Sequence, residues 1–190
     1  MSQPQPPQKA KLIIGIFLSE KALLVDLTHD LTAAFGDVDM VSPWFTFDYT
    51  EYYKAEMGHP LYRRMLVFKA LIAQETLARV KLATNEMEHR YTRNEKRRVN
   101  IDPGYLLYER FVLATGKNYT HRIYIGDQIY ADLTLIYQQG QYRPLPWTYP
   151  DYADPDMRSF LLTVRSKYGA DLNRLSENSE KETAGGANGI

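Results

Sequence analysis

Apolar residues divide the first part of the chain into a strand and a helix. Residues 12–18 form a nearly continuous apolar run around Gly15, which predicts a strand that is covered on both faces. Ser19 is a favoured N-cap residue, and apolar residues then recur at helical spacing until Gly36. We therefore expect a helix over residues 20–35.

The same alternation of elements continues to about residue 104. Strands are predicted over residues 37–41, 62–68 and 99–101, and a second helix over residues 73–91. The Asp102-Pro103-Gly104 sequence is expected to end the fourth strand in a turn. The order of strand, helix, strand, strand, helix, strand predicts an α+β fold: a ferredoxin-like (split βαβ) antiparallel sheet with two helices on one face.

A C-terminal β-hairpin should extend this sheet. Residues 120–125 and 129–137 are rich in β-branched and aromatic residues, and they flank a three-residue loop, Gly126-Asp127-Gln128. If Ile125 faces Ile129, the register forms two pairs on one face, Arg122 with Asp132 and Tyr124 with Tyr130.

A third helix should close the domain. Asp154 as N-cap and Pro155 at the first helical position predict its start, and Gly169 predicts its end. We expect a single α+β domain over residues 11–170. The Pro/Gln-rich residues 1–10 are expected to form a disordered lead, and residues 171–190 a disordered tail.

Composition narrows the range of functions. The 190 residues carry 23 basic and 23 acidic side chains, so net charge disfavours extended binding to a polyanion. The absence of cysteine excludes disulfides, thiolate metal sites and cysteine nucleophiles. The first residues lack the apolar core of a secretory signal, and no apolar run is long enough to span a membrane, so the expected location is the cytoplasm.

Several nucleotide and metal motifs are missing. Gly116-Lys117 is followed by Asn118 and has no upstream glycine at P-loop spacing, and no GxGxxG follows the first strand. The four histidines, at positions 29, 59, 89 and 121, are isolated from one another and form no HExxH motif. The sequence therefore assigns no metal ligands, and it leaves the cofactor unknown.

A group of charged and aromatic residues between positions 102 and 132 is the positive signal. Lys117, His121 and Arg122 are cations of the kind that hold an anion. Asp102 and Asp132 would orient these cations, accept a proton from a substrate or bind a divalent ion. The proposed catalytic residues are Asp102, His121 and Asp132, and the proposed ligand-binding residues are Asp48, Tyr49, Tyr105, Lys117, Arg122 and Tyr130.

Each member of this group also has a structural interpretation. Arg122 with Asp132 is equally the pattern of an ion pair on a strand surface, and Asp102 that of an Asx turn before Pro103. His121 fits a hydrogen-bonded strand residue, and Lys117 a solvated loop cation. Most of the tyrosines suit packing in a sheet.

Four segments together resemble a known family. They are FDYT at 47–50, NIDPGY at 100–105, HRIY with IYADLTL at 121–135, and PLPWTYPDY at 144–152. In this order, from about Lys11 to Tyr168, they are similar to an uncharacterised bacterial family, the domain of unknown function numbered forty-four sixteen. The resemblance implies no reaction, and the GTP-binding label of some members finds no P-loop here to support it.

The leading hypothesis is a cytoplasmic protein that binds, and in one version turns over, a small anionic ligand that is phosphorylated or nucleotide-like. The alternative is a non-catalytic ferredoxin-like module that binds RNA or a protein, with the basic turn at residues 93–98 touching phosphate. A third hypothesis makes the aromatic residues 44–53 a homodimer surface.

Overall fold

The computed structural model describes residues 1–45 and 57–185, with side chains up to residue 177. The strands of the single sheet are β1 (Ala10–Leu18), β2 (Val38–Val41), β3 (Tyr62–Ile72), β4 (Val99–Leu106), β5 (Arg110–Thr115), β6 (Arg122–Gly126), β7 (Ile129–Gln138) and β8 (Gln141–Pro144). The helices within the described residues are α1 (Leu23–Phe35), the 3₁₀ turn η1 (Gln74–Thr76), α3 (Leu77–Arg90), α4 (Pro150–Ala153) and α5 (Pro155–Gly185).

The strands form an antiparallel sheet of mixed α+β architecture, as predicted. Their order is β2-β3-β1-β4-β5-β7-β6, and β8 pairs with β7 beside this path. The first four strands, with α1 and α3 between them, follow the split βαβ order. The α+β class is confirmed, whereas the ferredoxin-like subtype stays a prediction because the sheet continues for four more strands.

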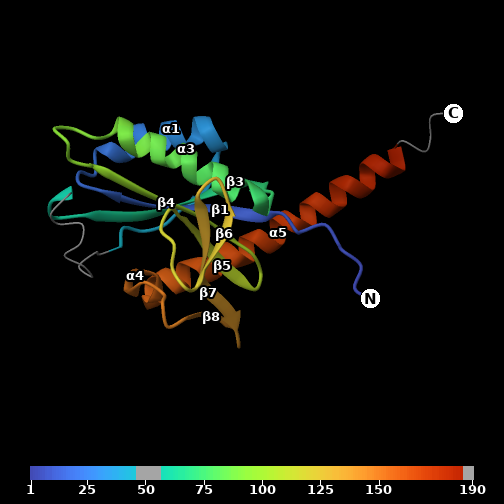
Figure 1. The fold of residues 1–190 in the computed structure, drawn as a ribbon. Coiled ribbons are helices and arrows are strands. Elements are labelled where there is room, and N and C mark those ends of the chain that lie inside the picture. The colour runs from blue at the N-terminus through green and yellow to red at the C-terminus, as the bar shows by residue number, and fades with distance from the viewer. Residues whose placement is uncertain (46–56, 186–190) are drawn as a thin grey trace.

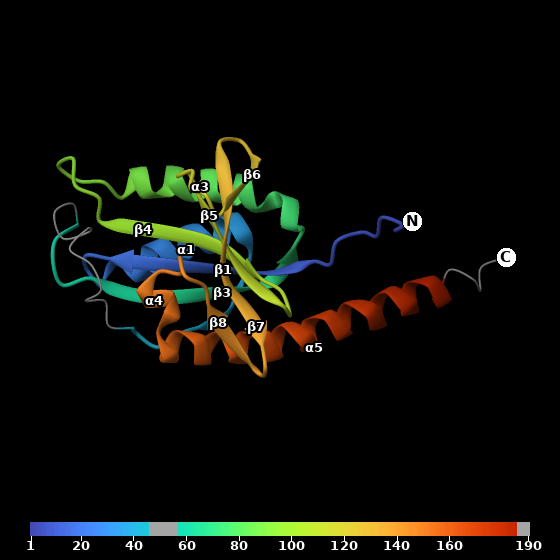
Figure 2. The ribbon, with the colours of Figure 1, turned by 60° about the horizontal axis from the view of Figure 1, so that its bottom comes forward.

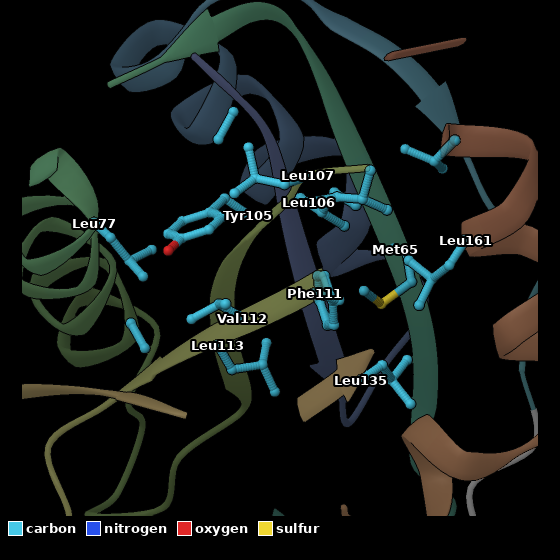
Figure 3. Packing of buried hydrophobic residues seen from close by; sticks show 14 of the residues in the cluster. Met65, Leu77, Tyr105, Leu106, Leu107, Phe111, Val112, Leu113, Leu135 and Leu161 are labelled. Carbon is cyan, nitrogen blue, oxygen red and sulfur yellow. The ribbon is translucent and has the colours of Figure 1, made fainter. Parts of the chain in front are cut away.

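Helices cover both faces of the central strand β1. α1 and α3 lie on one face and α5 crosses the other, and the distal part of α5 continues past the strands (Figures 1 and 2). All nine residues of β1 are buried. On the α1 and α3 side, Leu12, Ile14 and Ile16 pack in one apolar cluster. On the other side Ile13 joins a second cluster, in which Met65 of β3 and Leu161 of α5 face each other (Figure 3).

The first helix begins later than predicted. α1 starts at Leu23 after a turn, and Ala22 precedes it in a helical conformation without a side-chain cap. Ser19 is therefore not the N-cap, because it precedes Leu23 by four residues and its buried hydroxyl accepts no hydrogen bond from a described residue. The helix ends at Gly36 as expected, with φ at +88°.

Asp102-Pro103-Gly104 does not form the predicted turn, because β4 continues through it to Leu106. Pro103 is tolerated because β5 pairs with β4 only from Gly104 onward, so that edge of β4 needs no proline N–H. Gly104 is needed for close packing: a Cβ there would lie 2.4 Å from the carbonyl oxygen of Val112. The sequence did not predict β5.

The β6–β7 hairpin has the predicted side-chain pairs with a different loop. Arg122 faces Asp132 and Tyr124 faces Tyr130. However, Ile129 faces Gly126 instead of Ile125, after a shift in register. Asp127 and Gln128 have φ of +51° and +61°, so the loop has the two positive-φ residues of a type I′ turn.

The last helix starts as predicted and is longer. The Asp154 carboxylate accepts hydrogen bonds from the N–H groups of Asp156 and Met157, which makes it the N-cap. α5 passes through Gly169, where a Cβ would lie 2.7 Å from the Tyr108 hydroxyl, so this glycine serves packing and does not end the helix. The helix reaches Gly185, within the predicted tail, and the division into lead, domain and tail stays a prediction. Within the described residues, no helix is long and apolar enough to cross a membrane.

Candidate functional site

The hairpin and the segment after β8 assemble a polar and aromatic cluster around Asp132. Asp132 lies on the middle of β7, between β5 and β6, and only 4% of its surface is exposed. One carboxylate oxygen, Oδ2, accepts a hydrogen bond from Nε of Arg122 at 2.9 Å. The same oxygen lies 3.3 Å from Nε2 of His121, within hydrogen-bond distance. Thr134 donates a hydrogen bond to the Asp132 carbonyl at 3.0 Å. We name His121, Arg122, Asp132, Trp147 and Tyr149 the hairpin cluster.

Arg122 positions the parts of the hairpin cluster relative to one another. Besides Asp132, its guanidinium donates to the Lys117 carbonyl at 2.9 Å and to the Tyr149 hydroxyl at 3.0 Å. Burial alone would lower the pKa of Arg122, but the hydrogen bonds to Asp132 and Tyr149 outweigh burial and raise it. Arg122 thus stays charged and joins the loop before β6 to the segment after β8.

His121 presents its second ring nitrogen away from Asp132. Its ring is stacked on Trp147, with the centroids 4.9 Å apart and the planes at 13°. A carboxylate at Nε2 favours the tautomer with the proton on Nε2, which leaves a lone pair on Nδ1. No described residue forms a hydrogen bond with Nδ1, and 15% of the side chain is exposed.

The segment over residues 145–149 holds the aromatic wall of the cluster in place. Trp147 Nε1 donates to the Leu133 carbonyl at 2.8 Å, and the Thr148 hydroxyl donates to the Thr134 carbonyl at 2.5 Å. Both carbonyls belong to β7, so the segment lies along the strand that carries Asp132. Trp147 and Tyr149 stay 38% and 51% exposed. Neither residue was predicted as a site residue from the sequence, although both lie in the PLPWTYPDY segment.

This geometry combines a base, a fixed charge and accessible rings. A buried carboxylate that holds a histidine in one tautomer is a recurrent arrangement for proton transfer. The exposed rings next to it, of Tyr119, Trp147 and Tyr149, are suited to stacking on a planar group. The cluster has the parts for holding a planar, anionic ligand and for moving a proton on it.

The structure brings His121, Arg122 and Asp132 together, and the other predicted residues that it describes take different positions. Tyr130 is on the same strand face as Asp132, and its ring packs edge-on against Tyr124. Lys117 is exposed in the loop before β6 and contributes its carbonyl to Arg122. Asp48 and Tyr49 lie outside the described residues.

Asp102 belongs to a different part of the sheet. It lies on β4, with β5 between it and the strand of Asp132, which separates the two backbones by about 10 Å. Its carboxylate accepts a hydrogen bond from Asn100 at 2.9 Å and is 4.0 Å from Lys81. Asp102 therefore does not contribute to the hairpin cluster.

Tyr105 is a core residue. It is 8% exposed, and its ring points toward α3, near Leu77 (Figure 3). Since it is three residues from Asp102 on one strand, it faces the opposite side of the sheet. The predicted stacking role is not supported by this position.

The arginines in and beside the basic turn form ion pairs with carboxylates of the chain itself. Arg97 bonds to Glu88 at 3.1 Å and Arg98 to Glu20 at 2.8 Å, while Arg90 lies 3.4 Å from Asp30. These pairs reduce the positive charge that would attract RNA. In the described parts of the chain, no three histidine, aspartate or glutamate side chains are grouped to hold a metal ion.

A family model described as Domain of unknown function (DUF4416) matches residues 8–168. No curated protein and no solved structure matches the chain.

Proposed function

The chain belongs to the DUF4416 family, whose description names no activity, and we propose from the geometry alone that it binds a small anionic ligand with a planar group, such as a nucleotide, at the hairpin cluster. The observation that carries the proposal is the shared Oδ2 atom of Asp132, which fixes His121 and Arg122 in one orientation. A preorganised group of this kind needs no rearrangement when a ligand arrives.

The hairpin cluster and two neighbouring residues, Lys117 and Tyr119, have separate roles in this proposal. His121 contacts the ligand through Nδ1, as hydrogen-bond acceptor when neutral and as cation when protonated. Lys117 adds positive charge from the exposed loop before β6. Arg122 adds a second positive charge, and its hydrogen bond to the Lys117 carbonyl holds this loop in place. The planar group stacks on the exposed rings of Tyr119 and Tyr149.

The same arrangement supports turnover. A base with a free lone pair beside a bound phosphate ester or nucleotide is the group that an acid–base step requires. Asp132 stabilises the imidazolium that forms when Nδ1 takes a proton, because Nε2 already lies 3.3 Å from the carboxylate. His121 would then be the catalytic residue and Asp132 its positioning residue.

Thermal unfolding with added ligands tests the binding proposal. A mononucleotide, a sugar phosphate and inorganic phosphate are each added to the full chain, and we expect the mononucleotide to raise the Tm most. His121→Ala and Lys117→Ala should abolish or reduce this shift. Ile123→Ala is the matched control, because Ile123 is 70% exposed on the other face of β6. Equal shifts in all three variants would overturn the proposal.

A further inference from the structure

A buried arginine on β3 has an unfilled donor edge. Arg63 is 1% exposed, and its Nη1 forms an ion pair with Oδ2 of Asp151. Its other two nitrogens, Nε and Nη2, are shielded from solvent and have no hydrogen-bond partner among the described residues. Buried donors of this kind are rare in folded proteins and call for an explanation by a bound water, ion or ligand.

The two unfilled nitrogens form one side of the guanidinium. Nε–H and Nη2–H point in the same direction, and this pair of parallel donors matches two oxygen atoms on one carbon or phosphorus. Phe17 and Tyr152 fix the plane of the group, with ring centroids 4.9 and 4.3 Å from Cζ. The donor edge is therefore preorganised for an acceptor with two oxygens.

A second polar group next to Arg63 is also without a partner. The Tyr152 hydroxyl is buried and forms no hydrogen bond with a described residue. Burial raises the pKa of this hydroxyl, and the positive charge of the neighbouring Arg63 opposes the rise without cancelling it. Gly15 makes room for the hydroxyl, since a Cβ there would lie 2.9 Å from it.

The surroundings keep the charge of Arg63 balanced. Asp151 neutralises it, and burial, opposed by Arg63 and assisted by Asp102, raises the pKa of Asp151. Asp151 can therefore take up a proton if a second anion comes to share Arg63. Asp102, with 27% of its side chain exposed, adds negative charge close to Asp151 and Tyr152.

We infer that Arg63 and Tyr152 form a second binding site, separate from the hairpin cluster, for a carboxylate or phosphate group. The oxyanion would accept two parallel hydrogen bonds from Nε and Nη2 of Arg63 and a third from the Tyr152 hydroxyl. The segment over residues 145–153 connects the two sites, because Trp147 and Tyr149 belong to the first and Asp151 and Tyr152 to the second.

Nitrogen-15 NMR of the arginine Nε–H groups tests this site in the full chain. Arg63→Lys assigns the Arg63 signal by its loss. Inorganic phosphate and formate are then added separately, to distinguish a phosphate from a carboxylate, with chloride at equal ionic strength as the reference. We expect the Arg63 signal to shift saturably with one of the two oxyanions and to stay unchanged with chloride.

Three further variants separate anion binding from a purely structural role. Tyr152→Phe removes one donor and should weaken oxyanion binding about three- to tenfold, whereas Asp102→Asn removes negative charge and should strengthen it. Tyr124→Phe, a hydroxyl deletion on an exposed tyrosine, is the matched control and should change nothing.

The inference is overturned if neither oxyanion shifts the signal, if chloride shifts it equally, or if Tyr152→Phe and Tyr124→Phe bind alike. A bound water seen by cross-relaxation to Arg63 Nε–H, without an anion effect, would also overturn it. Should Arg63→Lys fail to fold, the response of the Tyr152→Phe protein to the same anions decides the question.

Discussion

Arg122 and Asp132 face each other across the β6–β7 ladder, and Nε of the arginine is 2.9 Å from Oδ2 of the aspartate. Only 4% and 6% of the two side chains are exposed, so this pair is largely desolvated. A pair of this kind holds its geometry, and the loss of one member leaves an uncompensated charge.

Asp132→Asn should destabilise the protein by about 3–5 kcal/mol, the usual cost of breaking a buried ion pair. The measurement is the free energy of unfolding in urea. Asp127→Asn, the same change on the exposed loop of the hairpin, is the control and should stay within about 0.5 kcal/mol. Equal effects at the two positions would mean that Asp132 carries no structural charge pair.

The hairpin loop should accept a stabilising substitution. Gln128 has φ at +61°, a conformation that glycine adopts without strain. Replacing Asp127-Gln128 by Asn-Gly, the preferred type I′ sequence, should raise the free energy of unfolding by roughly 0.5–1 kcal/mol. Chemical denaturation checks this, and a loss of stability would contradict the assigned turn.

Gly104 should not tolerate a methyl group. Its Cβ would lie 2.4 Å from the Val112 carbonyl, so Gly104→Ala must push β5 away from β4. We expect a loss of about 3 kcal/mol or more, at the upper end of overpacking effects. Gly116→Ala is the matched control, because nothing lies within 4 Å of that Cβ. A Gly104→Ala protein as stable as the control would refute the register of β4 with β5.

An ion network between β1, β2 and α5 should make stability depend on acid pH. Lys11 is fully buried and lies 2.8 Å from Asp39 and 2.6 Å from Asp171, and Lys167 contacts both aspartates. Burial would raise the pKa of each aspartate, but hydrogen bonds from Lys11 and Lys167 outweigh it and hold both below 3.8.

Because these folded-state pKa values are lowered, the stabilisation is complete above the unfolded value of 3.8 and is lost as the pH falls below it. The difference in unfolding free energy between the wild type and Asp171→Asn, followed from pH 6 to pH 2, should therefore shrink toward zero at the acid end. Taking the difference removes the opposite effects of Glu88 and Asp151, whose pKa values are raised by burial. A difference that is constant with pH would rule out the network as its source.

The hairpin could be predicted because its signals are local. Alternating residues and a short loop leave only a few registers, so the pairing of Arg122 with Asp132 followed from counting. The predicted pairing of Ile125 with Ile129 was wrong because a register shift places an extra residue on β6. No residue type in this stretch indicates such a bulge.

Glycines were the main source of error elsewhere. Gly104 and Gly169 stand beside residues far away in sequence, and their chain neighbours give no sign of that contact. Asp102-Pro103-Gly104 has the composition of a turn, but β4 continues through it. As a result, Asp102 and Tyr105 lie on one strand and face opposite sides of the sheet, which the sequence did not predict. Arg63 was missed because a charged residue inside a predicted strand normally points to solvent.

The central claim is that the hairpin cluster binds a planar anionic ligand, and the fluorescence of Trp147 tests it most directly. Trp44→Phe removes the other of the two tryptophans, so that the remaining emission reports on the ring stacked against His121. On titration with a mononucleotide we predict a saturable change in emission that His121→Ala abolishes and Ile123→Ala preserves. Emission that does not change, or that changes equally in the His121→Ala protein, would contradict the account.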